Sequence, residues 1–209
     1  DTTLEAVRRA RIVLAEINPA MPRTGPHSTV PVSRFDAMVE VEPKVAEYVH
    51  PAIGDAGERI ARYIARLVDD GATVQVGLGR VPNEVLRYLG SRRDLGVITD
   101  SLCDLMETGA VTGRRKTMSR GRVVASLALG TRRLYDLVDG NPDVVFRPID
   151  QVGDLDVVAA QRRMVSINQA FTIDLTGQVC AEARAGAQYG GVGATVAFHR
   201  GAERSAEGR

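Results

Sequence analysis

Two glycine-rich stretches hold the residues of this sequence that are best suited to chemistry. The first is Gly77-Leu78-Gly79, which follows an apolar run and precedes Pro82. The second is Gly-Gly-Val-Gly-Ala at 190–194. Glycine lets a main chain approach a ligand closely, and unpaired N–H groups at a helix start favour an anion or a developing oxyanion. Taken by itself, the first stretch could equally be a tight turn and the second a mobile loop.

A nicotinamide-binding loop is a weaker interpretation of the first stretch. A dinucleotide fingerprint has a third glycine and an acidic residue at the end of the following strand. Neither feature is convincing after Gly79. The sequence therefore disfavours a nicotinamide oxidoreductase.

The elements that would position these glycines alternate between strands and helices. Hydrophobic periodicity predicts strands at 73–77, 95–98, 122–128, 143–147, 164–168 and 171–175. It predicts helices at 82–89, 101–108, 131–138 and 154–161. This alternation is typical of an α/β fold with an open, mostly parallel sheet and flanking helices. In such sheets, ligands bind outside the carboxyl ends of the strands.

The sequence also predicts the structure of both ends of the chain and of a helix that precedes Gly77. Residues 3–17 have the pattern of an amphipathic helix that stops at Asn18-Pro19, followed by an irregular loop, a strand at 37–42 and a linker at 43–53. A helix should start at Asp55 with a capping box to Glu58. Its buried stripe would be Ile60, Ile64, Leu67 and Val68. Residues 195–198 should form a strand, and the polar tail 200–209 should be frayed.

Composition excludes several classes of function. The 209 residues carry a formal net charge of +1 and only 4% aromatics, so neither nucleic acid nor a membrane surface is an expected partner. No apolar run reaches the ~18 residues of a membrane helix. Cys103 and Cys180 form no CxxC pair and no signal peptide precedes them, which predicts a reducing cytoplasm. His27, His50 and His199 lack ligand spacing, so no metal is expected.

Several stretches together resemble the acetyl-CoA hydrolase/CoA-transferase family, in the branch that contains 4-hydroxybutyrate CoA-transferases. They run in family order through nearly the whole chain: AEINPAMPRT (15–24), VEVE (39–42), LVDDGATVQVGLGRVPNEVL (67–86), DLMETGAVTGRRKT (104–117), GTRRLYDLVDGNP (130–142), MVSINQAFTIDLTGQVCAE (164–182) and YGGVGATVAFHRGA (189–202). The resemblance implies a CoA-transferase-like fold. Residues 1–45 would end a first α/β domain, and 46–209 would form most of a second.

The resemblance also implies a reaction and its site. CoA would move from an acyl-CoA to a short carboxylate, or the thioester would be hydrolysed, through attack by a glutamate carboxylate and a covalent intermediate. Coenzyme A is then a substrate, no metal is needed, and a homo-oligomer is expected by family analogy. Gly77 and Gly79 match one loop that would stabilise an oxyanion. The matching CoA-binding loop is Gly191, Val192, Gly193 and Ala194, and the matching cleft residues are Asn18, Arg23 and Asn168.

Three departures from the family pattern bear on activity. The family's His-Ser/Thr-Glu segment, which carries the nucleophile, is absent after Val97, where about four residues are missing. Asp100 is the nearest carboxylate, although it could simply cap the next helix. Ala194 and Ala197 replace a glycine and an aspartate of the family's GxGGxxDF pattern, and the chain covers roughly half of a typical member. A catalytically silent CoA-binding or scaffold protein is the alternative function.

A cluster of basic residues leaves two interpretations open. Arg114, Arg115, Lys116, Arg120 and Arg122 could attract the phosphates of CoA, or they could belong to a solvated turn.

Overall fold

A five-stranded parallel sheet forms the centre of the protein. The computed structural model describes residues 2–42, 44–49, 51–99 and 103–209. The strand order is β6-β5-β4-β3-β7 and all neighbouring strands run parallel. The strands are β3 (Thr73–Val76), β4 (Gly96–Thr99), β5 (Val123–Ala125), β6 (Val144–Phe146) and β7 (Met164–Ile167). The predicted α/β class with an open, mostly parallel sheet is therefore confirmed.

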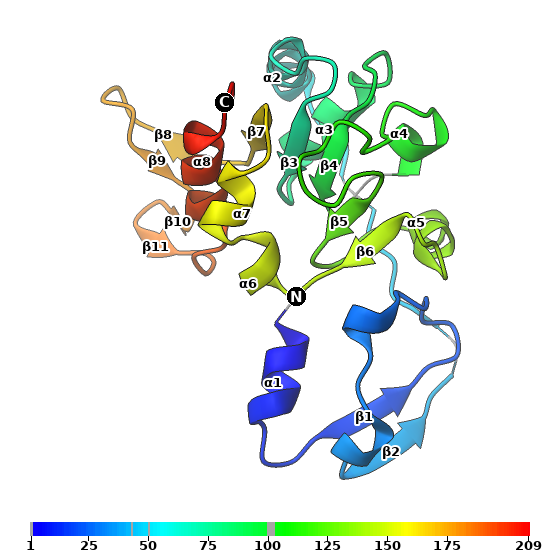
Figure 1. Cartoon of the computed structure of the whole chain (residues 1–209). Helices are drawn as coiled ribbons and strands as arrows, with labels where there is room; N and C mark the ends of the chain where they lie inside the picture. The colour runs from blue at the N-terminus through cyan, green and yellow to red at the C-terminus, as the bar shows by residue number, and fades with distance from the viewer. Residues whose placement is uncertain (1, 43, 50, 100–102) are drawn as a thin grey trace.

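Helices cover both faces of this sheet (Figure 1). One face packs against α2 (Asp55–Arg66), α3 (Arg80–Arg87), α4 (Cys103–Glu107) and α5 (Arg132–Val138), and the other against α6 (Ile149–Val152), α7 (Leu155–Ala159) and α8 (Thr195–Arg204). The two cores follow the two-residue period of a strand. In β5, Val123 and Ala125 join the first core, whereas Val124 packs against the second.

The chain reverses its direction of travel across the sheet between β3 and β7. After β3 it adds β4, β5 and β6 on one side, then returns through α6 and α7 to place β7 on the other side of β3. The connections that leave β3 and those that lead to β7 therefore lie on opposite faces, which separates the loops at this point. Such a switch point opens a crevice beyond the carboxyl ends of the two strands.

The expected helix at 3–17 is wrong beyond its first half. Helix α1 covers Thr3–Arg9, and β1 (Leu14–Ile17) then pairs in parallel with β2 (Ala37–Glu40). Arg34 donates to the carbonyls of Val7 and Ala10 at 2.6 and 2.7 Å, which satisfies the end of the helix. Residues 11–17 are rich in β-branched side chains that suit a strand. Pairing with β2 therefore overrode the helical pattern.

Short elements complete this first part of the chain. They are the 3-10 turns η1 (Pro26–Ser28) and η2 (Val32–Arg34). The β1–β2 pair forms its own two-stranded sheet, apart from the five-stranded one (Figure 1, blue). The division into domains at 1–45 and 46–209 stays a prediction.

Helix α2 forms as predicted but differs in its cap and in its buried face. Gly54 is the N-cap, and no side chain of the described residues caps the helix. With Gly54 as the N-cap, Glu58 stands four residues after the cap and not three, so the expected capping box does not form, and its carboxylate accepts a hydrogen bond from the Tyr88 hydroxyl at 2.8 Å. The buried positions are Ala61, Ala65 and Val68, whereas Ile60 and Leu67 are exposed. The two alanines at a spacing of four let the helix approach the sheet closely.

The carboxyl-terminal part of the chain also departs from expectation. Residues 195–198, predicted as a strand, begin helix α8, and its buried residues Phe198, Gly201 and Ala202 follow a helical period. The tail after Arg204 is not frayed, because the N–H of Arg209 donates to the Met164 carbonyl at 2.8 Å. The β-branched side chains of Thr195 and Val196 favour a strand, but the packing of this segment against α7 stabilises a helix.

Two antiparallel hairpins replace the single strand expected at 171–175. They are β8 (Thr172–Ile173) with β9 (Val179–Cys180), and β10 (Ala183–Arg184) with β11 (Ala187–Gln188). Helix α7 lies within the predicted range 154–161, and Asp154 is its N-cap, whose carboxylate accepts the N–H groups of Asp156 and Val157 at 2.9 and 3.0 Å. The hairpins lead the chain from β7 back towards α8 (Figure 1, orange).

Lys116 is a buried lysine at the amino end of the sheet. Its side chain is 1% exposed and its stem occupies the space left free by the missing Cβ of Gly96, the first residue of β4. The ammonium group donates to the carbonyl of Arg122 at 3.1 Å. Burial lowers the pKa of Lys116 to about 8 because it disfavours the charged form.

This burial predicts a stability that rises with pH. Between pH 8 and 10.5 the unfolded chain binds the Lys116 proton more tightly than the folded chain does, so the free energy of unfolding should increase with pH in this window. We expect a gain of about 2 kcal/mol from pH 7 to pH 9.5 for the natural chain relative to Lys116→Met. Denaturant unfolding at the two pH values measures it. Lys44→Met, which removes the other, exposed lysine, should leave the gain intact. An equal gain in Lys116→Met would contradict the prediction.

Candidate functional site

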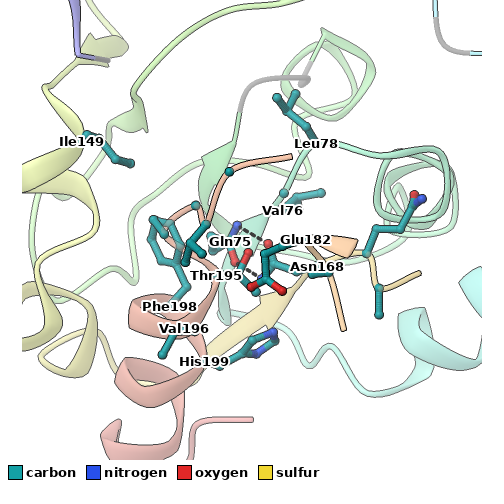
Figure 2. A pocket seen from close by; sticks show the side chains of 18 of the residues that line it. Gln75, Val76, Leu78, Ile149, Asn168, Glu182, Thr195, Val196, Phe198 and His199 are labelled. Atoms are coloured by element: carbon teal, nitrogen blue, oxygen red, sulfur yellow. Dashed lines mark hydrogen bonds between the residues drawn. The ribbon is translucent and has the colours of Figure 1, made fainter. Parts of the chain in front are cut away.

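A pocket of about 690 Å³ opens beyond the carboxyl ends of β3 and β7, at the point where the strand order reverses. Gly77 and Leu78 from the first glycine stretch line it, and so do residues 191–194 from the second. Its size is that of a small-molecule or cofactor site. The two stretches are far apart in the sequence, and the structure brings them to one cavity (Figure 2). Gly79 does not line the cavity but lies at its edge, against the pocket residue Gln169.

Three polar side chains at the ends of β3 and β7 are hydrogen-bonded to one another, and two of them, Gln75 and Asn168, line the pocket. Gln75 of β3 is 4% exposed and stands in register with Ser166 of β7. Gln75 Nε2 donates to Asn168 Oδ1 at 3.2 Å, and Asn168 Nδ2 donates back to Gln75 Oε1 at 3.0 Å. Asn168 Nδ2 also donates to Ser166 Oγ at 3.0 Å, and that hydroxyl donates to Gln75 Oε1 at 2.8 Å. The three side chains satisfy one another, so their orientation is fixed.

Gly77 is required by this amide network. A Cβ at position 77 would overlap Asn168 Oδ1. The N–H of Gly77 donates to the Ile167 carbonyl at 2.9 Å, which joins the ends of β3 and β7. That N–H is therefore not available to an oxyanion, and the role of Gly77 here is to make room for Asn168.

Other main-chain N–H groups at the pocket are free. Within the described residues, the N–H groups of Gly79, Gly191 and Gly193 have no hydrogen-bond partner. Gly79 is the N-cap of α3, with φ +152°. Among the described residues, apart from the adjacent ones in the chain, no atom lies within 4 Å of a Cβ position at Gly191 or Gly193, so this loop is open. Ala194 is the N-cap of α8 and packs against the second core, so its methyl group faces protein.

Two ionisable residues of the pocket were not anticipated from the sequence. Glu182 is the carboxylate that lines the pocket within the described residues, and its main-chain carbonyl accepts the N–H groups of Tyr189 and Gly190 at 2.8 and 3.0 Å. His199 of α8 lines the same pocket, and burial lowers its pKa, which favours the neutral imidazole at pH 7. No spacing rule connects these residues, because Glu182 lies between the two hairpins and His199 lies on α8. Gln75 did carry a signal, since it is a polar residue within a buried strand.

Several predicted site residues lie elsewhere. Asn18 accepts the N–H of Ala20 at 2.8 Å and donates to the Lys44 carbonyl, and the main chain of Arg23 bonds to Asp139 and Gly140. Neither Asn18 nor Arg23 lines the pocket, whereas Asn168 does. Asp100 lies outside the described residues.

The basic cluster at 114–122 lies at the opposite edge of the sheet. Its loop joins the amino end of β4, where the Leu95 carbonyl accepts the N–H groups of Thr112 and Gly113 at 3.2 and 2.9 Å. Lys116 is buried there, and Arg122 forms an ion pair with Asp143 at 3.9 Å. This position does not support contact with CoA phosphates at the pocket.

Two further features concern the residues that the structure describes. No group of three or more histidine, cysteine, aspartate or glutamate side chains in this part of the chain is arranged to hold a metal ion. Across the same residues, none of the helices has the length and apolar character needed to cross a bilayer.

Comparison with known proteins shows related sequences and folds. The family model described as "Acetyl-CoA hydrolase/transferase C-terminal domain" matches residues 130–209. The whole chain is 38% identical to a 4-hydroxybutyrate coenzyme A transferase of Clostridium kluyveri, of which it covers 50%. Over 99% of its length it is 36% identical to a succinyl-CoA:cyclohexane-1-carboxylate CoA transferase of Geobacter metallireducens, of which it covers 48%. The chain thus spans about half the length of the curated relatives it matches.

Solved structures agree with this relationship. The crystal structure of RipA from Yersinia pestis superposes with a TM-score of 0.92 at 37% identity, over 100% of this chain and 49% of that one. A 4-hydroxybutyrate CoA-transferase from Porphyromonas gingivalis gives a TM-score of 0.86 at 35% identity, over 100% of this chain and 51% of that one.

The dependence of the amide network on Gly77 can be tested by adding one methyl group. Gly77→Ala should displace Asn168 and lower the free energy of unfolding by about 1–3 kcal/mol, because overpacking forces neighbouring groups to shift. Gly90→Ala is the matched control, since among the described residues none outside its chain neighbours has an atom within 4 Å of its Cβ position. Denaturant unfolding of both variants measures the difference. Equal stabilities would show that the pocket can absorb the methyl group.

Proposed function

Because this chain belongs to the acetyl-CoA hydrolase/transferase family, we propose that it transfers CoA between an acyl-CoA and a short carboxylate, or hydrolyses the acyl-CoA. The observation that carries the proposal is the shared pocket: Gly77 and residues 191–194 line one cavity at the switch point of the sheet. A cavity of about 690 Å³ can take an acyl group with part of the CoA arm.

Thioester chemistry makes specific demands on such a pocket. A carboxylate oxygen attacks the thioester carbonyl, the C–S bond breaks, and CoA leaves as a thiolate. The carbonyl oxygen carries a negative charge in the tetrahedral intermediate, and main-chain N–H groups stabilise that charge. The unpaired N–H groups of Gly79, Gly191 and Gly193 are the candidates for this role. The thiolate then attacks the enzyme carboxyl carbon, which releases the acyl group as a free carboxylate.

Two carboxylates are candidates for the nucleophile. Asp100 follows from alignment with the family, although it lies outside the described residues. Glu182 follows from the pocket itself, because its side chain lines the cavity and its main chain is tied to the second glycine stretch through Gly190. A covalent step at either residue divides one difficult exchange into two easier ones.

Partners and location are part of the same proposal. The substrates are an acyl-CoA and a small carboxylate, without nucleic acid, membrane or metal, and the site of action is the cytoplasm. We also propose a homo-oligomer. Exposed apolar side chains on the β8–β9 hairpin, such as Ile173 and Leu175, are surfaces that a second subunit could cover.

Borohydride trapping tests the covalent route. After incubation with an acyl-CoA, borohydride should reduce a glutamyl- or aspartyl-CoA thioester to an alcohol, and peptide mass spectrometry should place this change on one carboxylate. Either Asp100→Asn or Glu182→Gln should abolish the change. Glu107→Gln removes a carboxylate that is paired with Arg133 on the surface, so it should have no effect.

The possible outcomes separate the alternatives. Turnover without any modified carboxylate would refute the covalent mechanism. Binding of CoA esters without turnover would instead identify a silent CoA-binding protein. The absence of both binding and turnover would refute the proposed function.

A further inference from the structure

His199 is an ionisable side chain of the pocket to which the transfer of CoA assigns no role. It lies in the second turn of α8 and lines the same cavity as Glu182 and residues 191–194 (Figure 2). It is also one of the exposed residues of the protein. Because the imidazole combines a place on the cavity wall with access from solvent, both water and a bound acyl-CoA can reach it.

The imidazole of His199 is not engaged by the rest of the described chain. Partial burial is the cause that lowers the pKa of His199, without a contribution from a hydrogen bond or a charged group of the described residues. This lowered pKa favours the neutral ring at pH 7. One nitrogen of a neutral imidazole carries a lone pair that can accept a proton. The pocket therefore presents a free base to its contents.

A carboxylate and an imidazole in one pocket favour different reactions. A carboxylate at neutral pH is ionised and weakly basic, so it acts on a thioester as a nucleophile. An imidazole gains and loses a proton close to pH 7, which suits it to general base catalysis. Attack by Glu182 or Asp100 starts CoA transfer, whereas attack by water requires a base that removes a proton.

The glycine loop that shares the cavity with His199 leaves room for water. Gly191, Val192 and Gly193 are exposed. Apart from the adjacent residues, no atom of the described chain lies within 4 Å of a Cβ position at either glycine. Water that reaches an acyl intermediate competes with the acceptor carboxylate, so a strict transferase has to exclude it. The open loop and the free imidazole together favour hydrolysis beside transfer.

We propose that His199 is the general base of a hydrolytic branch, in which it activates a water molecule that attacks the acyl carbonyl. The inference rests on the proposed function. An imidazole nitrogen takes one proton from the water molecule while the water oxygen bonds to the carbonyl carbon. The C–S bond breaks, and the imidazolium returns the proton to the departing thiolate. One acyl-CoA and one water thus give a carboxylic acid and free CoA.

Two reactions of butyryl-CoA, followed by chromatography, test the inference. Without an acceptor, the release of free CoA and butyrate measures hydrolysis, and with acetate the formation of acetyl-CoA measures transfer. His199→Gln keeps a hydrogen-bonding side chain but cannot take up a proton. The ratio of hydrolysis to transfer should fall about 100-fold in this variant, because a general base contributes at least that factor.

His27→Gln is the matched control for this ratio. The His27 ring lies 3.5 Å from the Arg147 guanidinium and lines a different cavity, which residues of α1 and α6 border. The control should keep the ratio of the natural chain. An unchanged ratio in His199→Gln overturns the inference, and so does an equal fall of both rates, because a histidine that only shapes the pocket would affect both reactions alike.

The natural chain separates failure of the inference from failure of the proposed function. Transfer without measurable hydrolysis overturns the inference and leaves the proposed function standing. The absence of both reactions overturns the two together.

Added imidazole gives a second readout that a structural role would not produce. His199→Ala leaves an opening at an exposed position, where free imidazole can take the place of the missing ring. Imidazole should restore hydrolysis in His199→Ala but not in His199→Gln, whose side chain fills that opening. Equal acceleration in both variants would show that imidazole acts from solution, and it would overturn the inference.

Discussion

The paired amides of Gln75 and Asn168 connect β3 to β7 at the only place where the strand order of the described sheet reverses. Polar groups in the interior of a sheet are costly unless they are satisfied. Here the reciprocal hydrogen bonds and Ser166 satisfy them. The network fixes the direction in which the chain leaves both strands, and so it fixes the two walls of the pocket that begin there.

The amide network requires glycine at the end of β3. The Asn168 amide occupies the space where a side chain at Gly77 would stand, and Gln169 occupies the corresponding space at Gly79. The first glycine stretch therefore serves two purposes: it admits two side-chain amides, and it leaves the N–H of Gly79 unpaired at the start of α3. The space that the two amides need and the role that we propose for the Gly79 N–H therefore both depend on Gly77-Leu78-Gly79.

The position of the second glycine stretch at the pocket depends on how the chain runs from β7 to α8. Two hairpins lead the chain away from the sheet and back to it. The carbonyl of Glu182 accepts hydrogen bonds from the N–H groups of Tyr189 and Gly190, which fixes the returning segment. Helix α8 then packs on α7, where Gly201 allows close contact with Val158. Residues 191–194 are thus held at the pocket mouth from both sides, while the loop itself stays open towards a ligand.

The sequence by itself determined the α/β class, most of the parallel strands and the family, because each depends on local periodicity or on motifs that are continuous in the chain. Tertiary structure decided the rest. Pairing with β2 turned residues 14–17 into a strand, and packing against α7 turned 195–198 into a helix. It also gathered Gln75, Gln169, Glu182 and His199 into one cavity with the glycines. Contacts between residues distant in sequence leave no periodic signal, so only the folded chain shows which polar groups find partners and which stay free.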